Sequence, residues 1–290
     1  MKHGRFAVSI MALTLLAGLA PAAQQDTAKT EIRQAIDAAY LNAYWNDMDI
    51  KALVKGWDYG AISQFIAPDD QMSFVSMIDW FGSMTARKAP AKKEYTFLYP
   101  VIDVVGDMAM AKVEVMKGET IEYTDYFPLF RTKTGWKIVA YPFYPHRNGV
   151  RPETAAAEAE AVKKTVEDTI VGGLLLNGTK EQILAGLGEV CDLNRYVPEL
   201  DAVAKQSLGS VLRARSAGLK APPVKSHDVT ILGITGNVAA AKLALAFEPD
   251  RVMTMYLALY KTRAGWKIVE LTSDKPLMVM FQPPRRPQAP

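Results

Sequence analysis

The stretch TKTGWKIV at residues 132–139 returns as TRAGWKIV at residues 262–269, 130 positions later. A second stretch, GDMAMAK at residues 106–112, returns as GNVAAAK at residues 236–242 with the same offset. An offset that is kept without a gap over this length indicates two copies of one domain. Single residues that keep the same spacing are Gly56 and Gly186, Pro68 and Pro198, and Tyr126 and Tyr256.

Each copy begins with a helical pattern and ends with a strand pattern. In the first copy, Ile32, Ile36, Tyr40 and Tyr44 recur every four residues, which predicts a helix with one apolar face. Asp49 is the expected N-cap of a second helix, as its counterpart Thr179 is in the second copy. The order predicts helices followed by an antiparallel meander, an α+β layout that occurs twice. We expect helices at residues 31–45, 49–55, 58–66 and 72–87, and strands at 95–105, 108–116, 121–130 and 136–143, with the same pattern 130 residues later.

Both ends of the chain are expected to lie outside the domains. Lys2, His3 and Arg5 precede the apolar stretch Phe6–Leu19 and the small residues Ala20-Pro21-Ala22, an order typical of a secretory signal peptide. An uncleaved membrane anchor is the alternative. The proline- and arginine-rich C-terminal end predicts an extended tail. The expected organisation is a signal peptide at residues 1–22, a first domain at 26–145, a linker at 146–154, a second domain at 155–276 and a tail at 277–290.

Composition excludes several classes of function. The 290 residues include 34 Lys+Arg against 31 Asp+Glu, so binding of nucleic acid by bulk charge is not expected. One cysteine excludes an intrachain disulfide, and with only three histidines a zinc site of the Cys/His type is not expected. Cys191 matches Ala61, which indicates a small buried apolar residue rather than a nucleophile. No phosphate-binding or dinucleotide-binding glycine motif is present. We therefore expect neither a metal nor another cofactor.

Several short segments of the first copy carry a resemblance to a known family. They are the expected helix at residues 31–45, FIAPD at 65–69, VVGDMA at 104–109, YTDYFPL at 123–129 and GWKIV at 135–139. In this order they resemble the NTF2-like superfamily, and more closely its lumazine-binding and SnoaL-like branch. The resemblance covers residues 26–144 and, more weakly, the second copy.

The resemblance implies two tandem cones, each with helices packed on a curved antiparallel β-sheet. It also implies a small apolar ligand in the cone and a pseudo-dimer in which the first domain pairs with the second through their sheets. One departure concerns the histidine that related sequences often carry before the proline. Ala67 stands there in the first copy, and Tyr196-Val197-Pro198 lacks it in the second. This departure weakens the transfer of a ligand-binding role.

The third strand of the first copy contains an unexpected carboxylate. In the second copy the alternate positions Met253, Met255, Leu257 and Leu259 form an apolar face. The matching row of the first copy includes Asp125, which must there be hydrogen-bonded, paired or raised in pKa. Three roles are open for it: a structural group, a ligand contact, or a general base of the kind that ketosteroid-isomerase-type members use. The matching row is Tyr123, Asp125, Phe127 and Leu129.

Aromatic side chains are concentrated in the first copy, whereas the matching positions of the second copy are mostly aliphatic or small. This difference makes the first copy the better candidate for a ligand site, with core packing as the alternative for each ring. The aromatic residues considered are Tyr40, Tyr44, Trp45, Trp57, Tyr59, Trp80, Tyr95, Tyr99, Tyr123 and Tyr126. The expected ligand pocket consists of Tyr40, Tyr44, Trp57, Trp80, Tyr95, Tyr123, Asp125 and Phe127, with Asp125 as the candidate catalytic residue.

Three functions remain open at this point. The first is an exported, periplasmic or extracellular, non-catalytic protein that binds a small apolar or aromatic molecule in its first domain. The second is an enzyme of isomerase, cyclase or hydrolase type with Asp125 as base and Tyr123, Tyr40 or Tyr44 as hydrogen-bond donor. The third is a structural or protein-interaction module whose cones are filled by their own side chains. The sequence offers no second ionisable group with clear spacing, which favours the first and third. No membrane contact is expected once the signal is cleaved.

Overall fold

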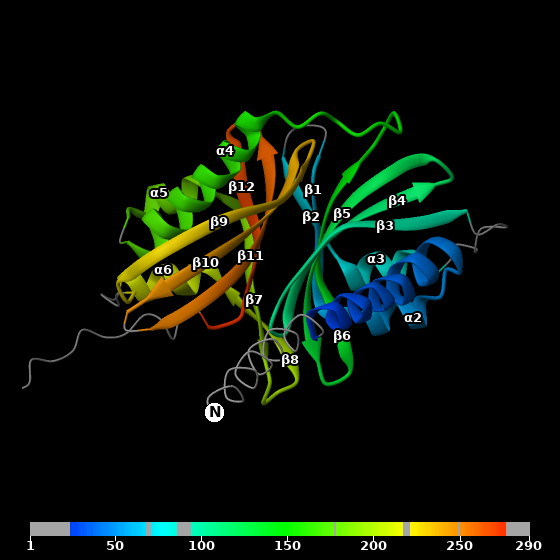
Figure 1. The fold of residues 1–290 in the computed structure, drawn as a ribbon, viewed down its shortest axis with the longest axis horizontal. Helices are drawn as coiled ribbons and strands as arrows, with labels where there is room; N and C mark the ends of the chain where they lie inside the picture. The colour runs from blue at the N-terminus through cyan, green and yellow to red at the C-terminus, as the bar shows by residue number, and fades with distance from the viewer. Residues whose placement is uncertain are drawn as a thin grey trace, which may run out of the picture.

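The computed structural model forms two α+β domains with their sheets at the centre of the molecule and their helices on the outer sides (Figure 1). The expected signal peptide and C-terminal tail lie outside the described residues. Within the described part of the chain, no helix combines the length and the apolar character needed to cross a bilayer. The structure describes residues 24–67, 71–85, 94–176, 178–216, 221–248 and 250–276.

The first domain begins with a helix over residues 24–36, which continues directly as a π-helix. Its six strands follow the order β2-β1-β6-β5-β4-β3. Neighbouring strands are antiparallel except β1 and β6, which run parallel. The elements after the first helix are η1 (Asp37–Asn46), α2 (Ile50–Gly56), β1 (Trp57–Ile66), β2 (Met72–Ser76), α3 (Met77–Ser83), β3 (Tyr95–Val105), β4 (Met108–Lys117), β5 (Thr120–Thr132) and β6 (Gly135–Pro145).

The second domain repeats this plan, with sheet order β8-β7-β12-β11-β10-β9 and one parallel pair between β7 and β12. Two tandem α+β domains of this kind confirm the fold expected from the repeat. The elements are α4 (Ala156–Val166), η2 (Glu167–Leu175), α5 (Lys180–Ala185), β7 (Leu187–Val197), β8 (Ala202–Ser207), α6 (Leu208–Ser216), β9 (Val224–Thr235), β10 (Val238–Phe247), β11 (Arg251–Thr262) and β12 (Gly265–Ser273).

Local signals in the sequence predicted caps and turns correctly. The Asp49 carboxylate accepts hydrogen bonds from two backbone N–H groups of α2, and the Thr179 hydroxyl oxygen accepts one from the backbone N–H group of Gln182 in α5. Gly106 and Gly236 have φ of +58° and +56° in the two-residue turns of the β3–β4 and β9–β10 hairpins. Glycine adopts this left-handed conformation without the steric cost of a Cβ.

Two expected helices are wrong. Residues 58–66 form strand β1, which pairs with both β2 and β6, and residues 72–76 form strand β2 before the short helix α3 begins. Apolar runs this short fit a helix and a buried strand equally well. Whether this segment becomes a helix or a strand depends on partners far along the chain. Strand β1 pairs with β6, as in the Ile62–Ala140 pair, and so takes backbone hydrogen bonds from a distant strand.

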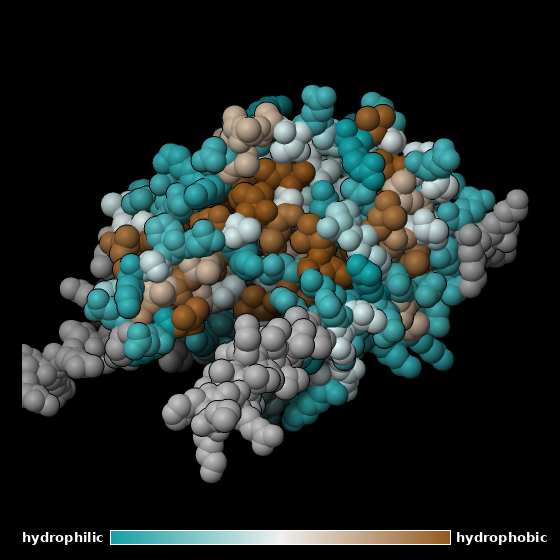
Figure 2. All heavy atoms as spheres, in the orientation of Figure 1, coloured by the Kyte–Doolittle hydropathy of each residue, from teal (hydrophilic) through white to brown (hydrophobic). Residues whose placement is uncertain are grey.

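Each domain has its own apolar core between sheet and helices, and a third core lies between the two sheets. We call the core space of the first domain the first cone and that of the second domain the second cone. Figure 2 shows apolar side chains gathered near the middle of the visible face, where the two sheets meet in Figure 1. The core between the sheets consists of Met108, Met110, Tyr126, Phe130, Val139, Val238, Ala240, Tyr256, Ala258, Tyr260 and Val269.

A polar contact reinforces this interface on one side. Asp103 of β3 accepts hydrogen bonds from the ammonium group of Lys242, at 2.8 Å to its Oδ2, and from the hydroxyl group of Tyr256. The charged side chains of the pair retain about a quarter of their exposure, so water only partly screens the attraction. Strands β3, β10 and β11 thus join the two domains by a charge-assisted contact.

The equivalent position on the other side lacks the carboxylate. Gly233 of the second domain is the residue that corresponds to Asp103 in the repeat. Lys112, the counterpart of Lys242, has no ion pair among the described residues, and its Nζ lies 5.9 Å from the ring centroid of Tyr126. Burial lowers the pKa of Lys112.

This asymmetry provides a matched pair of variants. Lys242→Met is expected to lower the free energy of unfolding by about 1–2 kcal/mol, because it leaves the Asp103 carboxylate at the interface without its cation. Lys112→Met is expected to be neutral or stabilising, because it removes a half-buried charge that no described carboxylate pairs with. Chemical denaturation of both variants checks the difference. Equal destabilisation by the two substitutions would contradict it.

Candidate functional site

The first cone contains a continuous network of aromatic rings. Tyr40 of η1 is fully buried at its centre and lies within 6.1 Å, ring centroid to centroid, of six other rings. Trp57 and Phe127 are also buried there. The six rings around Tyr40 belong to Tyr44, Trp45, Trp57, Phe97, Phe127 and Tyr141.

The remaining expected pocket residues extend this network to the edge of the cone. Trp80 contacts Tyr44 at 4.8 Å, and Tyr95 and Tyr123 contact Trp45 at 4.6 and 5.4 Å between ring centroids. These five side chains are half-buried. The structure therefore brings all eight expected residues into one region, with the deep part filled by rings and the half-buried rings at its outer edge.

Two of the aromatic residues considered with them lie elsewhere. Tyr59 is 82% exposed on β1, because the predicted helix in that segment is a strand that turns this side chain outward. Tyr126 lies in the core between the two sheets, since it alternates with the cone-facing Asp125 and Phe127 along β5.

Asp125 is fully buried in the first cone. Neither of its carboxyl oxygens has a hydrogen bond of normal geometry from any described residue. Burial raises the pKa of Asp125 well above its usual range, and the nearby hydroxyl groups of Tyr40 and Tyr141 act in the opposite direction. Phe127 and Leu129 share its face in the first cone, which confirms the strand register expected for this row.

A pair of tyrosine hydroxyl groups lies beside the carboxyl group. The hydroxyl oxygens of Tyr40 and Tyr141 are 2.5 Å apart and share one hydrogen bond. Burial raises the pKa of both phenols, and the charge of an ionised Asp125 raises each further. Burial therefore favours the protonated form of all three groups, the carboxyl group and the two phenols.

Tyr141 is the residue of this group that sequence reasoning missed. Trp136 and Ile138 of β6 face the first cone, and strict alternation from them turns Tyr141 away from it. A bulge between the Asp125–Phe143 and Leu129–Ile138 pairs adds one residue and moves Tyr141 to the cone side. Strand β12 of the second domain contains a matching bulge. The repeat therefore preserves the bulge, but it is recognised from the strand pairing and not from the sequence.

Further polar atoms in this region lack partners. The indole nitrogens of Trp45 and Trp57 and the side-chain oxygen of Asn46 are buried without a hydrogen bond among the described residues. Buried polar groups in folded proteins nearly always have a protein or water partner. The unpartnered set contains two N–H donors, one carbonyl acceptor and a carboxyl group that can do both. It can therefore complement a planar molecule that carries carbonyl or ring-nitrogen groups.

The second domain has no such arrangement in its cone. Ile170, Leu174 and Met255 occupy the positions that match Tyr40, Tyr44 and Asp125, and all three are buried in an aliphatic core. Its π-helix η2 lies where η1 lies in the first domain. Long π-helices are rare and often mark functional sites. Because both copies have one, the π-helix here belongs to the common framework, and the polar cluster is specific to the first cone.

The described residues form neither a metal site nor an activated cysteine. Among the described residues, no group of three or more His, Cys, Asp or Glu side chains is placed to hold a metal ion. Cys191 packs against the core of the second cone, and burial raises the pKa of its thiol. Tyr40 and Asp125 line none of four surface cavities that described residues form.

Comparison with known proteins gives one family match. Residues 30–144 match the model of the family described as "Putative lumazine-binding". No curated protein sequence matches the chain.

Solved structures with a similar fold include three NTF2-like proteins. One from Shewanella baltica is 17% identical, with 41% of this chain and 94% of that chain covered and a TM-score of 0.36. One from Silicibacter pomeroyi is 20% identical, with 40% and 94% covered and a TM-score of 0.35. One from Cytophaga hutchinsonii is 11% identical, with 41% and 98% covered and a TM-score of 0.34.

Proposed function

We propose that the first cone binds a small aromatic molecule, on the premise that residues 30–144 match the family described as "Putative lumazine-binding". The observation that carries the proposal is the Asp125 carboxyl group, which is buried without a normal hydrogen bond among aromatic rings. Such a group destabilises the protein unless something else binds it. In this proposal, a ligand that enters between the half-buried rings at the outer edge of the cone supplies that partner.

The unpartnered atoms define the ligand's chemistry. The indole N–H groups of Trp45 and Trp57 donate to carbonyl or ring-nitrogen acceptors, and the Asp125 carboxyl group does so in the protonated form that its burial favours. The surrounding rings favour a flat body that stacks or packs edge to face. A pteridine or flavin-type heterocycle carries both features. The second cone, with its aliphatic lining, serves in this proposal as a scaffold.

Titration of the full chain with riboflavin and with 6,7-dimethyl-8-ribityllumazine tests this proposal. The tryptophans in the cone report binding by fluorescence quenching. Asp125→Ala is expected to weaken binding at least about tenfold, because it removes a buried hydrogen bond to the ligand. Trp266→Phe is the matched control, since the indole of Trp266 donates to Glu158 in the second domain. Absence of quenching by either heterocycle, or unchanged affinity in Asp125→Ala, would contradict the proposal.

A second candidate function is catalysis by the same groups. The hydrogen-bonded Tyr40–Tyr141 pair beside Asp125 favours it, because a buried carboxylate and two phenols can move a proton at a bound substrate. Asp125→Asn separates the two functions. It keeps the shape and hydrogen-bonding capacity of the side chain but cannot act as a base. Loss of turnover with retained binding identifies an enzyme, and retained binding without turnover in the wild type identifies a binding protein.

We also propose that the protein is exported. The basic start, the apolar stretch Phe6–Leu19 and the small residues Ala20-Pro21-Ala22 support this proposal. The intact mass of the protein produced with its native N-terminus tests it. A mass that includes residues 1–22 would contradict cleavage.

A further inference from the structure

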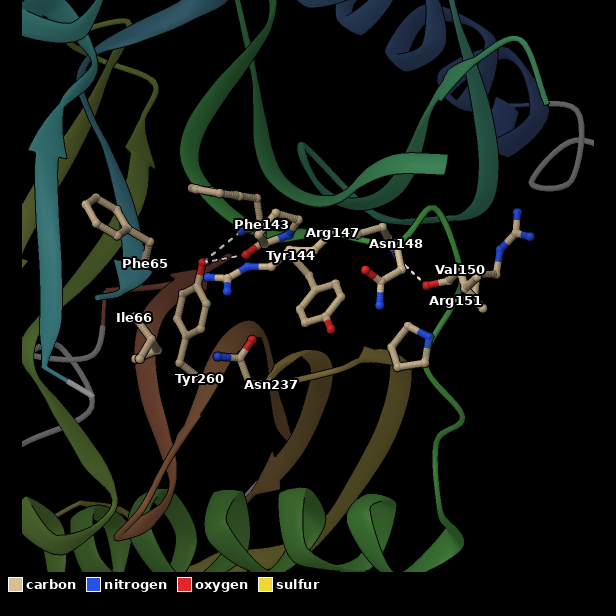
Figure 3. A pocket seen from close by; sticks show the side chains of 13 residues that line it. Phe65, Ile66, Phe143, Tyr144, Arg147, Asn148, Val150, Arg151, Asn237 and Tyr260 are labelled. Atoms are coloured by element: carbon tan, nitrogen blue, oxygen red, sulfur yellow. Dashed lines mark hydrogen bonds between the residues drawn. The ribbon is translucent and has the colours of Figure 1, made fainter. Parts of the chain in front are cut away.

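The two domains form a pair of cavities that the repeat relates to each other. The first, of about 660 Å³, lies between the ends of β1 and β6, the segment after β6, and the β9–β10 hairpin and β11 of the second domain (Figure 3). We call it the linker cavity. The second, of about 420 Å³, is built by the same elements with the domains exchanged: the ends of β7 and β12, the β3–β4 hairpin and β5. We call it the opposite cavity.

The two cavities have different walls at matching positions. In the linker cavity, Phe143 and Tyr144 come from β6, where the opposite cavity has Ser273 and Asp274. The turn residue of the facing hairpin is Asn237 in one and Asp107 in the other. The remaining matched pairs, linker cavity first, are Phe65 and Arg195, Ile66 and Tyr196, His146 and Pro276, and Tyr260 and Phe130.

Charge divides the two cavities most clearly. Arg147 and Arg151 line the linker cavity, and none of its described lining residues is acidic. The opposite cavity is lined by three carboxylates and one arginine. Two sites with a common plan have thus acquired opposite charge. The acidic residues of the opposite cavity are Asp107, Glu199 and Asp274.

Only one of the two arginines in the linker cavity is available to a ligand. Arg151 is held by Glu114, with its Nε 3.0 Å from Oε1 and a second bond from its terminal nitrogen. Arg147 is exposed and forms no ion pair with any described residue. Figure 3 shows Arg147 and Tyr144, from the end of β6 and the segment after it, on one side of the cavity and Asn237 of the β9–β10 turn on the other. An unpaired guanidinium in a concave site favours a planar anion that accepts two hydrogen bonds.

The other walls fit an aromatic body. Phe65, Phe143, Tyr144 and Tyr260 line the cavity, and Asn237 adds an amide that both donates and accepts. The volume lies within the range of small-molecule sites.

Packing fixes two of the wall residues in place. The Tyr260 hydroxyl group is bound to the backbone of β1 and β6, at 2.5 Å from the carbonyl oxygen of Gln64. Tyr144 packs so closely on the β9–β10 turn that a Cβ at Gly236 would overlap its ring. The wall is therefore formed before any ligand binds.

His146 also lines the linker cavity, but its ring nitrogens are hydrogen-bonded within the protein and are not available to a ligand. Its Nδ1 lies 2.9 Å from the carbonyl oxygen of Val150, which can only accept, so Nδ1 carries the hydrogen. Its Nε2 then accepts from the Thr124 hydroxyl group at 2.8 Å. Both ring nitrogens are occupied, and burial lowers the pKa of the imidazole. The free charge in the cavity is that of Arg147.

We propose that the linker cavity is a second ligand site, separate from the first cone, which binds a small organic anion with an aromatic body. Arg147 binds the carboxylate or sulfonate group, Asn237 contacts its edge, and the aromatic walls hold the ring. Because the walls come from both domains, the site exists only when the two domains are packed together. The opposite cavity, with its three carboxylates, repels the same anion.

Fluorescence titration with a matched pair of probes tests this proposal. The anionic probe is 8-anilinonaphthalene-1-sulfonate, and N-phenyl-1-naphthylamine is a neutral probe with the same aromatic body. Arg147→Gln is expected to weaken binding of the sulfonate about tenfold or more and to leave the neutral probe unchanged. Arg195→Gln is the control, because it removes an arginine from the opposite cavity. That variant is expected to bind the sulfonate as the wild type does.

Three results would overturn the proposal. One is absence of sulfonate binding to the wild type, and another is wild-type affinity in Arg147→Gln. The third is an equal loss of affinity in Arg147→Gln and Arg195→Gln, which would indicate non-specific attraction to positive charge. Arg147 is exposed, so its substitution is expected to leave the fold intact, and circular dichroism of each variant checks that it is folded.

Discussion

Asp125→Asn is expected to stabilise the protein by an amount that grows as the pH rises above about 4, the ordinary pKa of an unfolded aspartate. Burial raises the pKa of Asp125 in the folded protein. The folded state therefore binds a proton that the unfolded state has already lost. Stability from this group is complete below the unfolded pKa and declines as the pH rises toward the folded pKa. Asparagine has the same shape and no charge to bury.

The size of the effect follows from proton linkage. Each pH unit between the unfolded and folded pKa of the group changes the free energy of unfolding by up to about 1.4 kcal/mol. One such unit already matches the effect of a typical single substitution on the free energy of unfolding. The comparison must be made as a difference from the wild type, because Glu114 and Glu158 have lowered pKa values and act in the opposite direction.

Denaturation of wild type and Asp125→Asn at pH 4, 5, 6, 7 and 8 checks this prediction. Glu270→Gln is a second case, since Glu270 is 1% exposed and burial raises its pKa as well. Asp250→Asn, at an exposed position, is the control and is expected to follow the wild-type curve. Parallel curves for wild type and Asp125→Asn would show that Asp125 has an ordinary pKa in the folded protein.

Gly56→Ala and Gly186→Ala are each expected to lower the free energy of unfolding by about 2–3 kcal/mol, because they overfill a close contact. Gly56 ends α2 against η1, where an added Cβ would overlap the Cβ of Ala39. Gly186 follows α5 at the matching place, where the added Cβ would overlap the side chain of Thr169. The contact is made by a backbone and a short side chain, so neither partner has a flexible end that can move away.

Gly82→Ala is the matched control for these variants. Gly82 lies inside α3, and an added Cβ there meets nothing within 4 Å. Alanine is therefore expected to stabilise by about 0.4–1 kcal/mol through reduced freedom of the unfolded chain. The double variant of Gly56 and Gly186 is expected to show the sum of the single effects, because the two contacts lie in different domains. Unchanged denaturation midpoints in the single variants would contradict the prediction.

The candidate site was partly predictable because β5 is a regular strand along the row that contains Asp125. Alternation correctly placed Tyr123, Asp125 and Phe127 on one face, and the aliphatic row of the second copy marked Asp125 as unusual. Tyr141 was not predictable, since the bulge in β6 moves it to the cone side. The helix predicted at residues 58–66 was wrong, because a short apolar run takes its conformation from the strands that pair with it.

The sequence by itself determined that this protein has two copies of one α+β domain, with their caps, hairpin turns and strand faces. These features depend on local residue preference and on a repeat that can be read directly. Only the tertiary structure decided that Tyr40 and Tyr141 meet beside Asp125, that Asp103 pairs with Lys242, and that the linker cavity combines walls from both domains. These contacts join residues 100 or more positions apart, and their partners are set by strand pairing and domain packing rather than by any neighbouring residue.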